Sequence, residues 1–311
     1  MEKKKPENNQ PTHLDREEDC LQTFLMADDT IRGAVLNGSR MISQMRRNHE
    51  LGILETLVLG HAYLGACLLG ASLKGNDRLA LQVDCSGPVK GLVVEANAAG
   101  AVRGFLKNVP IPVEKPLEDF NLSPFFGAGF ISVIRILADA KRPFTGKVMM
   151  AHGSLAKDLA HYYLTSEQIP TSFSLSVKFD KLGNVAAAGG MFLQAMPDAE
   201  NAVVRRIEAQ VVALPSIATL LAEGTAPEDL VRNYLGDYSP RFIDRRQVCF
   251  ICHCNRDQIR NVLTLLNIDE LKDIQEKGPF PVEIRCHHCN TRYTFDREHI
   301  DLIVAARFSK N

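Results

Sequence analysis

The cysteines near the C-terminus constrain the fold of this chain more than any other feature. Five of its eight cysteines lie in two short clusters, CFICHC at 249–254 and CHHC at 286–289. Two such clusters, separated by a segment that can fold, have the spacing of metal ligands. Four thiolates around Zn²⁺ make a closed tetrahedral site with no position for a catalytic water. We therefore expect a structural zinc site and no zinc-dependent hydrolysis.

Spacing alone leaves two sets of metal ligands open. One set pairs Cys249 and Cys252 with Cys286 and Cys289, which makes two C-x-x-C knuckles. The other set replaces Cys249 with Cys254 and uses the tighter C-x-C pair. Four thiolates already complete the coordination sphere, so we expect the three histidines of these turns to be solvated: His253, His287 and His288.

Composition and charge are those of a soluble globular protein. Hydrophobic residues make up 45% of the 311 residues and charged residues 23%, and the formal net charge of −1 gives no general attraction to nucleic acid or an anionic membrane. The polar N-terminus lacks the apolar core of a secretory signal. We therefore expect a disordered tail over residues 1–19 and a cytoplasmic, reducing environment, where structural disulfides are rare. The scattered cysteines are expected to be small apolar side chains or surface thiols: Cys20, Cys67 and Cys85.

One apolar run, at 51–73, is long enough to span a bilayer. It contains Glu55, His61 and several glycines, and nothing in the sequence suggests a polar cavity to receive the two titratable groups. We predict that this run is a buried helix of a soluble core rather than a membrane span.

The region 20–197 predicts an α+β fold with an antiparallel sheet. Residues 20 to about 75 have a helical pattern, and a second helix, which Ser154 can cap, is predicted over 154–168. Short runs rich in β-branched and apolar residues predict strands at 78–85, 91–97, 101–107, 129–137 and 145–152 and a hairpin at 171–180 and 185–196. Strands and helices do not alternate strictly, which disfavours a parallel doubly wound sheet.

Residues 198–247 predict a helical linker. Apolar residues recur at helical spacing over 203–214, up to Pro215, and a second helix is expected to begin at the capping-box spacing of Thr225 and Glu228. The apolar stripes of these helices need a cover, because an isolated helix of this length is marginal in water.

The final segment, 248–311, combines the cysteine clusters with a small α+β pattern. It predicts helices at 255–266, 269–278 and 296–308, the last capped by Asp296, and strands at 281–286 and 291–295. We therefore expect a small C-terminal zinc-binding domain after the linker.

Several stretches give the chain a family resemblance that runs from about Asp29 to Phe308. They are TIRGAV, GPVKGLVVEANAAGAVRGFLKN, TGKVMMAHGSLAKDLAHYYLTSEQIPTS, AAGGMFLQAMP, CHCNRDQI and CHHCNTRYTF. YYLTSEQIPT together with a terminal C-x-C and C-x-x-C resembles the redox-regulated heat-shock chaperones of about 33 kilodaltons, zinc-binding holdases of the bacterial cytosol. The resemblance implies one zinc ion per reduced chain and assigns its ligands to four thiols: Cys252, Cys254, Cys286 and Cys289. Cys249 lies outside the family pattern.

The resemblance also implies a function. Members of the family bind unfolding proteins, prevent their aggregation under oxidative stress, form homodimers when active and are not enzymes. For this chain the resemblance implies a substrate-binding and dimerisation domain over 20–197, a metastable linker over 198–247 and a redox-switch domain over 248–311. We expect no nucleic-acid or membrane partner, no catalytic residue and no cofactor besides zinc.

Physical chemistry is consistent with a redox switch of this kind. Thiolates are the reactive form of cysteine, and oxidation removes them as metal ligands. A structural zinc site contributes on the order of 10–16 kcal/mol of apparent folding free energy, whereas a segment of about 60 residues barely folds on its own core. Loss of the metal is thus expected to unfold the last segment and expose the apolar stripes of the linker. The bridges expected in the oxidised protein are Cys252–Cys254 and Cys286–Cys289. We expect Cys249 to be a bystander; the alternative is that it traps Cys252 in a Cys249–Cys252 disulfide during oxidation.

A zinc ribbon that binds nucleic acid is the alternative function. Arg241, Arg245 and Arg246 precede the cysteine clusters. Residues 245–311, however, carry 11 Lys and Arg against 9 Asp and Glu, a balance of +2 that is weak for phosphate binding.

An enzyme is the second rival. His161, Ser166 and Glu167 could suggest a catalytic set, but a helix places His161 and Ser166 on different faces. The stretch AAGGM lacks the pattern of a phosphate-binding loop. We therefore expect that the chain is not an enzyme.

Overall fold

The computed structural model describes residues 18–113 and 121–308. Its elements form two compact units, a core unit that ends at Phe250 and a C-terminal unit that begins at Ile251. Both units combine helices with antiparallel strands, so the predicted α+β fold is confirmed. Residues 1–17 of the predicted tail lie outside the described residues. Asp19, at its end, is buried, and its carboxylate accepts hydrogen bonds from the backbone N–H groups of Arg40 and Met41.

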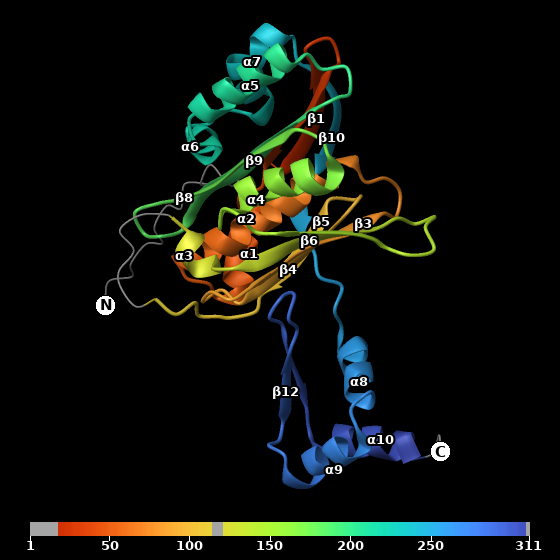
Figure 1. Cartoon of the computed structure of the whole chain (residues 1–311). Coiled ribbons are helices and arrows are strands. Elements are labelled where there is room, and N and C mark those ends of the chain that lie inside the picture. The colour runs from red at the N-terminus through yellow and green to blue at the C-terminus, as the bar shows by residue number, and fades with distance from the viewer. Residues whose placement is uncertain (1–17, 114–120, 309–311) are drawn as a thin grey trace, which may run out of the picture. The chain divides into compact units, whose positions relative to one another are not determined.

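The first sheet of the core unit has five antiparallel strands in the order β10-β1-β2-β9-β8 (Figure 1). These strands are β1 (Cys20–Met26), β2 (Ile31–Asn37), β8 (Thr171–Phe179), β9 (Val185–Ala195) and β10 (Arg241–Gln247). The predicted hairpin of β8 and β9 is confirmed.

The helical prediction for residues 20 to about 75 is wrong over β1 and β2, which form an antiparallel hairpin. Six of the seven residues of β2 are buried, because the strand lies in the interior of the sheet and is covered on both faces. A strand buried on both faces reads as a continuous apolar run without the period-2 alternation that identifies a half-buried strand.

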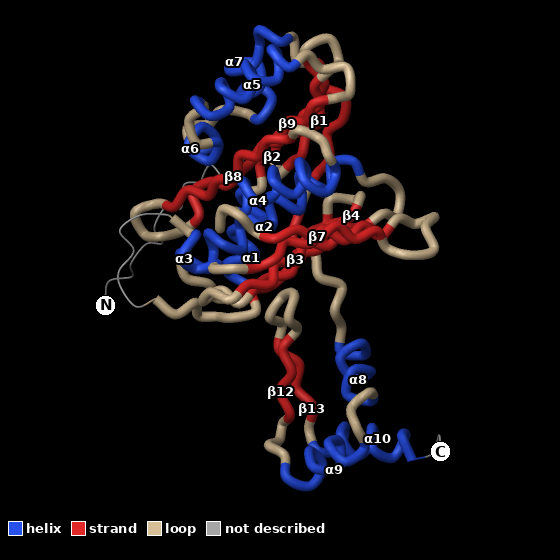
Figure 2. Tube along the Cα trace, in the orientation of Figure 1, coloured by secondary structure: helices blue, strands red, loops and turns tan. Residues whose placement is uncertain are grey.

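The second sheet has six strands in the order β11-β5-β4-β3-β6-β7. Figure 2, which colours strands red, labels β3, β4 and β7 of this sheet. These strands are β3 (Arg78–Cys85), β4 (Gly91–Asn97), β5 (Ala101–Leu106), β6 (Gly129–Ile136), β7 (Phe144–Met149) and β11 (Cys249–Phe250). All neighbours are antiparallel except β11 and β5, which pair in parallel. The five strands predicted between 78 and 152 are thus confirmed, although β7 ends three residues earlier than predicted.

Helices fill the space between the two sheets. They are α1 (Ser39–His49), α2 (Ile53–Leu69) with its 3-10 extension η2 (Gly70–Ser72), and α4 (Leu155–Tyr162), which continues in the π-helical turn η3 (Tyr163–Glu167). A Cβ atom at Gly65 of α2 would meet Leu159 of α4 at 2.9 Å and both Leu175 of β8 and Leu81 of β3 at 3.8 Å. The missing side chain therefore lets α2 lie close to α4, while the side chains of β8 and β3 reach the same position of α2 at ordinary contact distance. A further short helix, α3 (Ser123–Phe126), precedes β6.

The apolar run at 51–73 forms this central helix, as predicted. Ile53–Ser72 is the one helical stretch among the described residues that is long and apolar enough to cross a membrane, and it is 89% buried inside the protein. The buried carboxylate of Glu55 accepts a hydrogen bond of 2.8 Å from the backbone N–H of Ile111. Burial lowers the pKa of His61 to about 4, so its ring is neutral in the core.

The linker segment covers the other face of the first sheet. It forms α5 (Asn201–Ala213), α6 (Ile217–Ala222), α7 (Pro227–Leu235) and the 3-10 turn η4 (Gly236–Tyr238), and then strand β10. Ile207, Leu221 and Leu230 pack in one apolar cluster with Val35 and Met191 of the sheet. The segment is not helical throughout, although a helical linker was predicted. Its last residues form β10, which pairs with β1 at the edge of the sheet.

The predicted capping box of α7 is not formed. The helix begins at Pro227 with Ala226 as its N-cap and no side-chain capping bond. Glu228 accepts hydrogen bonds from Arg232 instead. Ser154 occupies the predicted N-cap position of α4, also without a side-chain bond to the helix.

The C-terminal unit contains the elements that the sequence predicts. They are α8 (Arg256–Thr264), α9 (Ile268–Lys277), β12 (Val282–Arg285), β13 (Arg292–Phe295) and α10 (Arg297–Phe308). Asp296 caps α10, since its carboxylate accepts a hydrogen bond of 3.0 Å from the backbone N–H of His299. The buried apolar side chains form one small cluster: Leu263, Leu271, Phe295, Ile300, Ile303 and Val304.

Candidate metal centre

Four cysteine sulfurs of the C-terminal unit lie together. The Sγ atoms of Cys252, Cys254, Cys286 and Cys289 are all within 4.8 Å of one another. Cys252 Sγ is 3.8 Å from Cys286 Sγ, and Cys254 Sγ is 3.3 Å from Cys289 Sγ. In a tetrahedron with Zn–S bonds of about 2.3 Å, neighbouring sulfurs are about 3.8 Å apart. The four thiols can therefore hold a metal ion, and their softness and number suit Zn²⁺.

A tight turn between β12 and β13 presents two of these sulfurs. The backbone N–H of Asn290 donates to the carbonyl of Cys286 at 2.8 Å, and the N–H of Cys286 donates to the carbonyl of Thr291 at 3.0 Å. Asn290 takes a positive φ of 58°, a conformation that Asn tolerates better than most residues. The hairpin thus folds back on itself over CHHC and brings Cys286 and Cys289 to the same side.

The other two sulfurs lie in the short segment that leads into α8. Asn255 follows Cys254 directly and caps this helix, because its side chain accepts a hydrogen bond of 2.9 Å from the backbone N–H of Gln258. The capped helix start limits the conformations of the residues that precede it. Cys252 and Cys254 are half-buried, whereas Cys286 and Cys289 are buried.

Two hydroxyl groups that the sequence analysis missed approach this cluster. The Tyr293 hydroxyl donates to Cys254 Sγ at 3.1 Å. The Thr291 hydroxyl oxygen lies 3.2 Å from Cys289 Sγ. The sequence could have indicated both residues. In the strand predicted over 291–295, side chains alternate, so residues 291 and 293 share one face beside the second cysteine pair.

The thiols of the cluster differ in acidity. Burial raises the pKa of Cys254 and of Cys286 above the usual value of a thiol. Burial acts in the same direction on Cys289, but hydrogen bonds with the Thr291 hydroxyl and backbone and with the Cys254 and Cys286 sulfurs together outweigh it and lower the pKa of Cys289 to about 7. The Cys289 thiol is therefore more acidic than those of Cys254 and Cys286.

Cys249 is in the core unit rather than in this group. It lies on β11, opposite Ala101 of β5, and its backbone N–H donates to the carbonyl of Gly100 at 3.0 Å. The histidines of the two turns do not belong to the group of close ligand atoms either: His253 and His287 are exposed and His288 is half-buried. The ligand set with the C-x-C pair therefore fits this structure better than the set with two C-x-x-C knuckles.

The arginines considered for nucleic-acid binding belong to β10. Arg241 forms an ion pair with Asp29 at 2.8 Å. Arg246 approaches Asp244 at 3.7 Å and donates to the carbonyl oxygens of Gly70 and Leu73. Two of the three arginines thus have partners within the protein, which gives no support to a phosphate-binding surface here.

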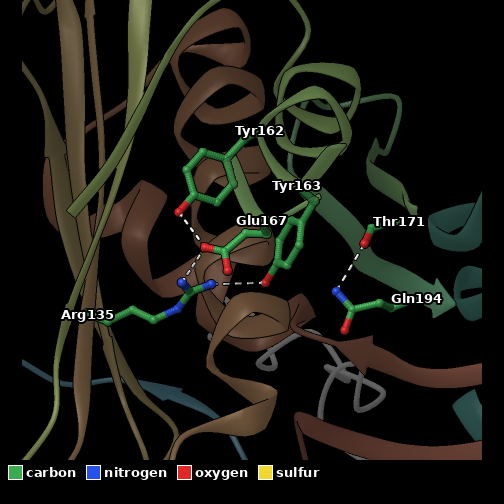
Figure 3. Close-up of polar contacts among 6 residues, drawn as sticks. All are labelled: Arg135, Tyr162, Tyr163, Glu167, Thr171 and Gln194. Atoms are coloured by element: carbon green, nitrogen blue, oxygen red, sulfur yellow. Dashed lines mark hydrogen bonds and ion pairs between the residues drawn. The ribbon is translucent and has the colours of Figure 1, made fainter. Parts of the chain in front are cut away.

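The residues considered for catalysis do not form a catalytic set. Figure 3 shows Glu167 turned toward Arg135, with an ion pair of 2.6 Å, and toward the Tyr162 hydroxyl at 2.8 Å. His161 instead faces His152, with ring centroids 6.1 Å apart. These contacts join η3 to the second sheet, as Gln194 and Thr171 join β9 to β8, and they explain the polar side chains of this motif as structural.

Three comparisons with known proteins agree. A sequence profile of the family described as Hsp33 protein matches residues 19–296. The chain is 34% identical over 289 residues to a 33 kDa chaperonin of Syntrophotalea carbinolica, covering 92% of this chain and 99% of that protein. It is likewise 34% identical over 286 residues to a 33 kDa chaperonin of Geobacter sulfurreducens, covering 91% and 94%. The crystal structure of the 33 kDa chaperonin (heat shock protein 33 homolog) of Thermotoga maritima matches 94% of this chain and all of that one, with a TM-score of 0.85 and 31% identity.

Proposed function

The chain belongs to the Hsp33 family, whose members are named chaperonins and not enzymes, and we propose that it is a holdase activated by oxidation. The chaperone binds unfolding proteins and keeps them from aggregating during oxidative stress. One observation carries the redox part of this proposal, namely the group of four sulfurs within 4.8 Å of one another.

In the reduced chain, Cys252, Cys254, Cys286 and Cys289 together bind one zinc ion. When bound, Zn²⁺ keeps the four sulfurs as thiolates and contributes to the folding free energy of the C-terminal unit. Each sulfur comes from a short local turn, so the two turns are held together through their sulfurs.

Oxidation converts the ligands to disulfides. A thiolate gives an electron pair to peroxide, the O–O bond breaks, and the leaving hydroxide takes up a proton to become water. The resulting sulfenic acid is attacked by a second thiolate, which forms the S–S bond and releases the sulfenic oxygen as hydroxide, protonated to a second water. The bridges we propose are Cys252–Cys254 and Cys286–Cys289, because each pair stays close in the chain even after the unit opens. Peptide mapping that finds mainly Cys254–Cys289, the pair now 3.3 Å apart, would replace this assignment.

The linker is the part that captures clients. Helices α5 to α7 hold their apolar side chains against the first sheet, in the cluster that includes Ile207, Leu221 and Leu230. Loss of the fold after Phe250 removes the constraint at the end of β10 and β11, and mild warmth then releases the helices. Peroxide alone should therefore activate weakly, and peroxide with warmth strongly.

Light scattering of a heat-denaturing client protein tests the proposal. Oxidised protein should suppress aggregation and release about one zinc per chain, and reduced protein should do neither. Cys249→Ser is the matched control and should behave as the native chain. Equal activity of both forms would exclude redox regulation. Size-exclusion chromatography of the oxidised form tests the homodimer that we propose as the active state in the cytoplasm; no nucleic-acid partner is expected.

A further inference from the structure

We propose that the hydroxyl groups of Tyr293 and Thr291 set the oxidant sensitivity of the sulfur cluster. Each is a positioning residue that acts through a cysteine sulfur: Tyr293 through Cys254 and Thr291 through Cys289. The inference rests on the proposed function, because it takes the four sulfurs to be metal-bound thiolates in the resting chain.

The two hydroxyls reach the two sulfurs that lie closest together. Tyr293 Oη is 3.1 Å from Cys254 Sγ, Thr291 Oγ1 is 3.2 Å from Cys289 Sγ, and these two sulfurs are 3.3 Å apart. One sulfur belongs to the C-x-C pair and the other to the C-x-x-C pair. The hydroxyls therefore flank the contact at which the two cysteine turns meet.

Strand β13 holds the Tyr293 hydroxyl in place, and Thr291 directly precedes the strand. Residues 293 and 295 share one face of the strand, because side chains alternate. Phe295 is fully buried in the small apolar cluster, and the Tyr293 ring packs against the same cluster, as does Ile284, its partner on β12. The tyrosine ring is thus anchored in the core of the C-terminal unit while its hydroxyl contacts a sulfur.

The Tyr293 hydroxyl donates to its sulfur, whereas the Thr291 hydroxyl accepts from the protonated Cys289 thiol and becomes a donor once that sulfur is a thiolate. A hydroxyl that donates to a thiolate withdraws electron density from the sulfur. The thiolate then reacts more slowly with peroxide, because its lone pair is the nucleophile that breaks the O–O bond. The same hydrogen bond orients the sulfur and strengthens metal binding, as outer partners of metal ligands do. Loss of either hydroxyl should therefore weaken zinc retention and speed the oxidation of the sulfur it contacts.

Stopped-flow zinc release on full-length Tyr293→Phe tests the proposal, with peroxide as the oxidant and a metallochromic indicator as the readout. We expect a severalfold larger second-order rate constant in peroxide and a zinc affinity weaker on the order of tenfold in competition with a chelator. At the second position, Thr291→Val should likewise raise the rate constant and weaken zinc binding. Thr291→Ser keeps the hydroxyl and should show the native rate constant and zinc affinity.

Cobalt substitution separates an electronic effect from a loosened fold. Without the Tyr293 hydrogen bond, the sulfur-to-cobalt charge-transfer band should move to lower energy, which a purely structural role would not cause. Thr294→Val is the matched control. Thr294 is exposed on the other face of β13 from Tyr293, and its cross-strand partner on β12 is Glu283. It should leave the peroxide rate constant and the cobalt band unchanged.

The outcomes distinguish the inference from the proposed function. Unchanged peroxide rate constants in Tyr293→Phe and Thr291→Val, with one zinc still bound through the four cysteines, would overturn the inference alone. A reduced native chain that binds no zinc would overturn the proposed function first. A rate increase in Thr294→Val equal to that in Tyr293→Phe would show that strand packing, and not the sulfur contact, sets the rate.

Discussion

The core unit and the C-terminal unit hold their folds by different means. In the core unit, α2 lies between two sheets, and large side chains such as Tyr63, Met41 and Leu59 are fully buried. The C-terminal unit has one cluster of six buried apolar residues among those described, beside four sulfurs. A segment of about 60 residues gains little from so small a core. The comparison separates a part that is stabilised by burial from a part whose small core lies beside four cysteines that can hold a metal ion.

Removal of the metal should produce the largest difference in stability between the two units. A structural zinc site contributes on the order of 10–16 kcal/mol, which matches or exceeds the whole margin of about 5–15 kcal/mol that a domain has. A strong chelator under reducing conditions should therefore unfold the C-terminal unit and leave α2 folded. Hydrogen exchange should become fast in α8, α9 and α10 and stay slow in α2. If α8 to α10 stayed protected from hydrogen exchange without metal, the six buried side chains alone would be enough to keep the C-terminal unit folded.

Single cysteine variants sharpen the same contrast residue by residue. Cys254→Ser should lose most of its zinc and the protection of α8, because a serine hydroxyl is a poor ligand for this metal. Cys249→Ser should keep one zinc per chain, since Cys249 pairs with β5 in the core unit. Metal analysis of both reduced proteins measures this. Zinc retained in Cys254→Ser and lost in Cys249→Ser would instead identify the two C-x-x-C knuckles as the site.

A cavity in the C-terminal unit and a cavity in the linker should have different effects. The first should lower the peroxide concentration for zinc release, and the second should lower the temperature of activation. Leu271 and Leu230 are both fully buried, the first in the C-terminal unit and the second on helix α7 of the linker. Each change to Ala should cost about 2–5 kcal/mol locally. Leu271→Ala should lower the peroxide concentration needed for half-maximal zinc release. Leu230→Ala should leave zinc release unchanged and lower the temperature at which the oxidised protein becomes active. The same threshold moving in both variants would mean that the two parts unfold as one.

A smaller effect of opposite sign is expected at Gln22. This β1 side chain is only 8% exposed, and its Oε1 atom has no hydrogen-bond partner among the described residues. It shares a face of the strand with Phe24, which packs in the cluster under the linker helices. Gln22→Leu should stabilise the docked linker by about 1–2 kcal/mol, because it removes an unsatisfied buried acceptor.

Protease digestion of the oxidised protein measures the change in Gln22→Leu. Cleavage in α5 to α7 should need a higher temperature than in the native chain, and client binding should shift by the same amount. Gln22→Glu, which buries a charge at the same place, is the opposite control and should open the linker at a lower temperature. A linker that opens at one temperature in all three proteins would show that Gln22 has no part in its docking.

Local patterns predicted much of the fold, and their failures have a common cause. The half-buried strands β3 to β5 alternate between buried and more exposed residues, and the C-terminal helices and hairpin have clear boundaries, so these elements were predicted. Strand β2 was missed because it is covered on both faces. Strand β10 was missed because RFIDRRQ, mostly exposed, has no apolar face and becomes a strand only by pairing with β1.

The sequence by itself determined that two short cysteine clusters would meet, because closely spaced thiols on two turns suit one metal ion. It also determined the family, through motifs spread over most of the chain. Only the tertiary structure separated Cys249 from its neighbours in CFICHC, by pairing Cys249 with Ala101 on β5. Only the tertiary structure brought the Tyr293 hydroxyl to Cys254, 39 residues earlier in the chain. Contacts between distant residues depend on sheet register and core packing, and no local spacing of residue types encodes either one.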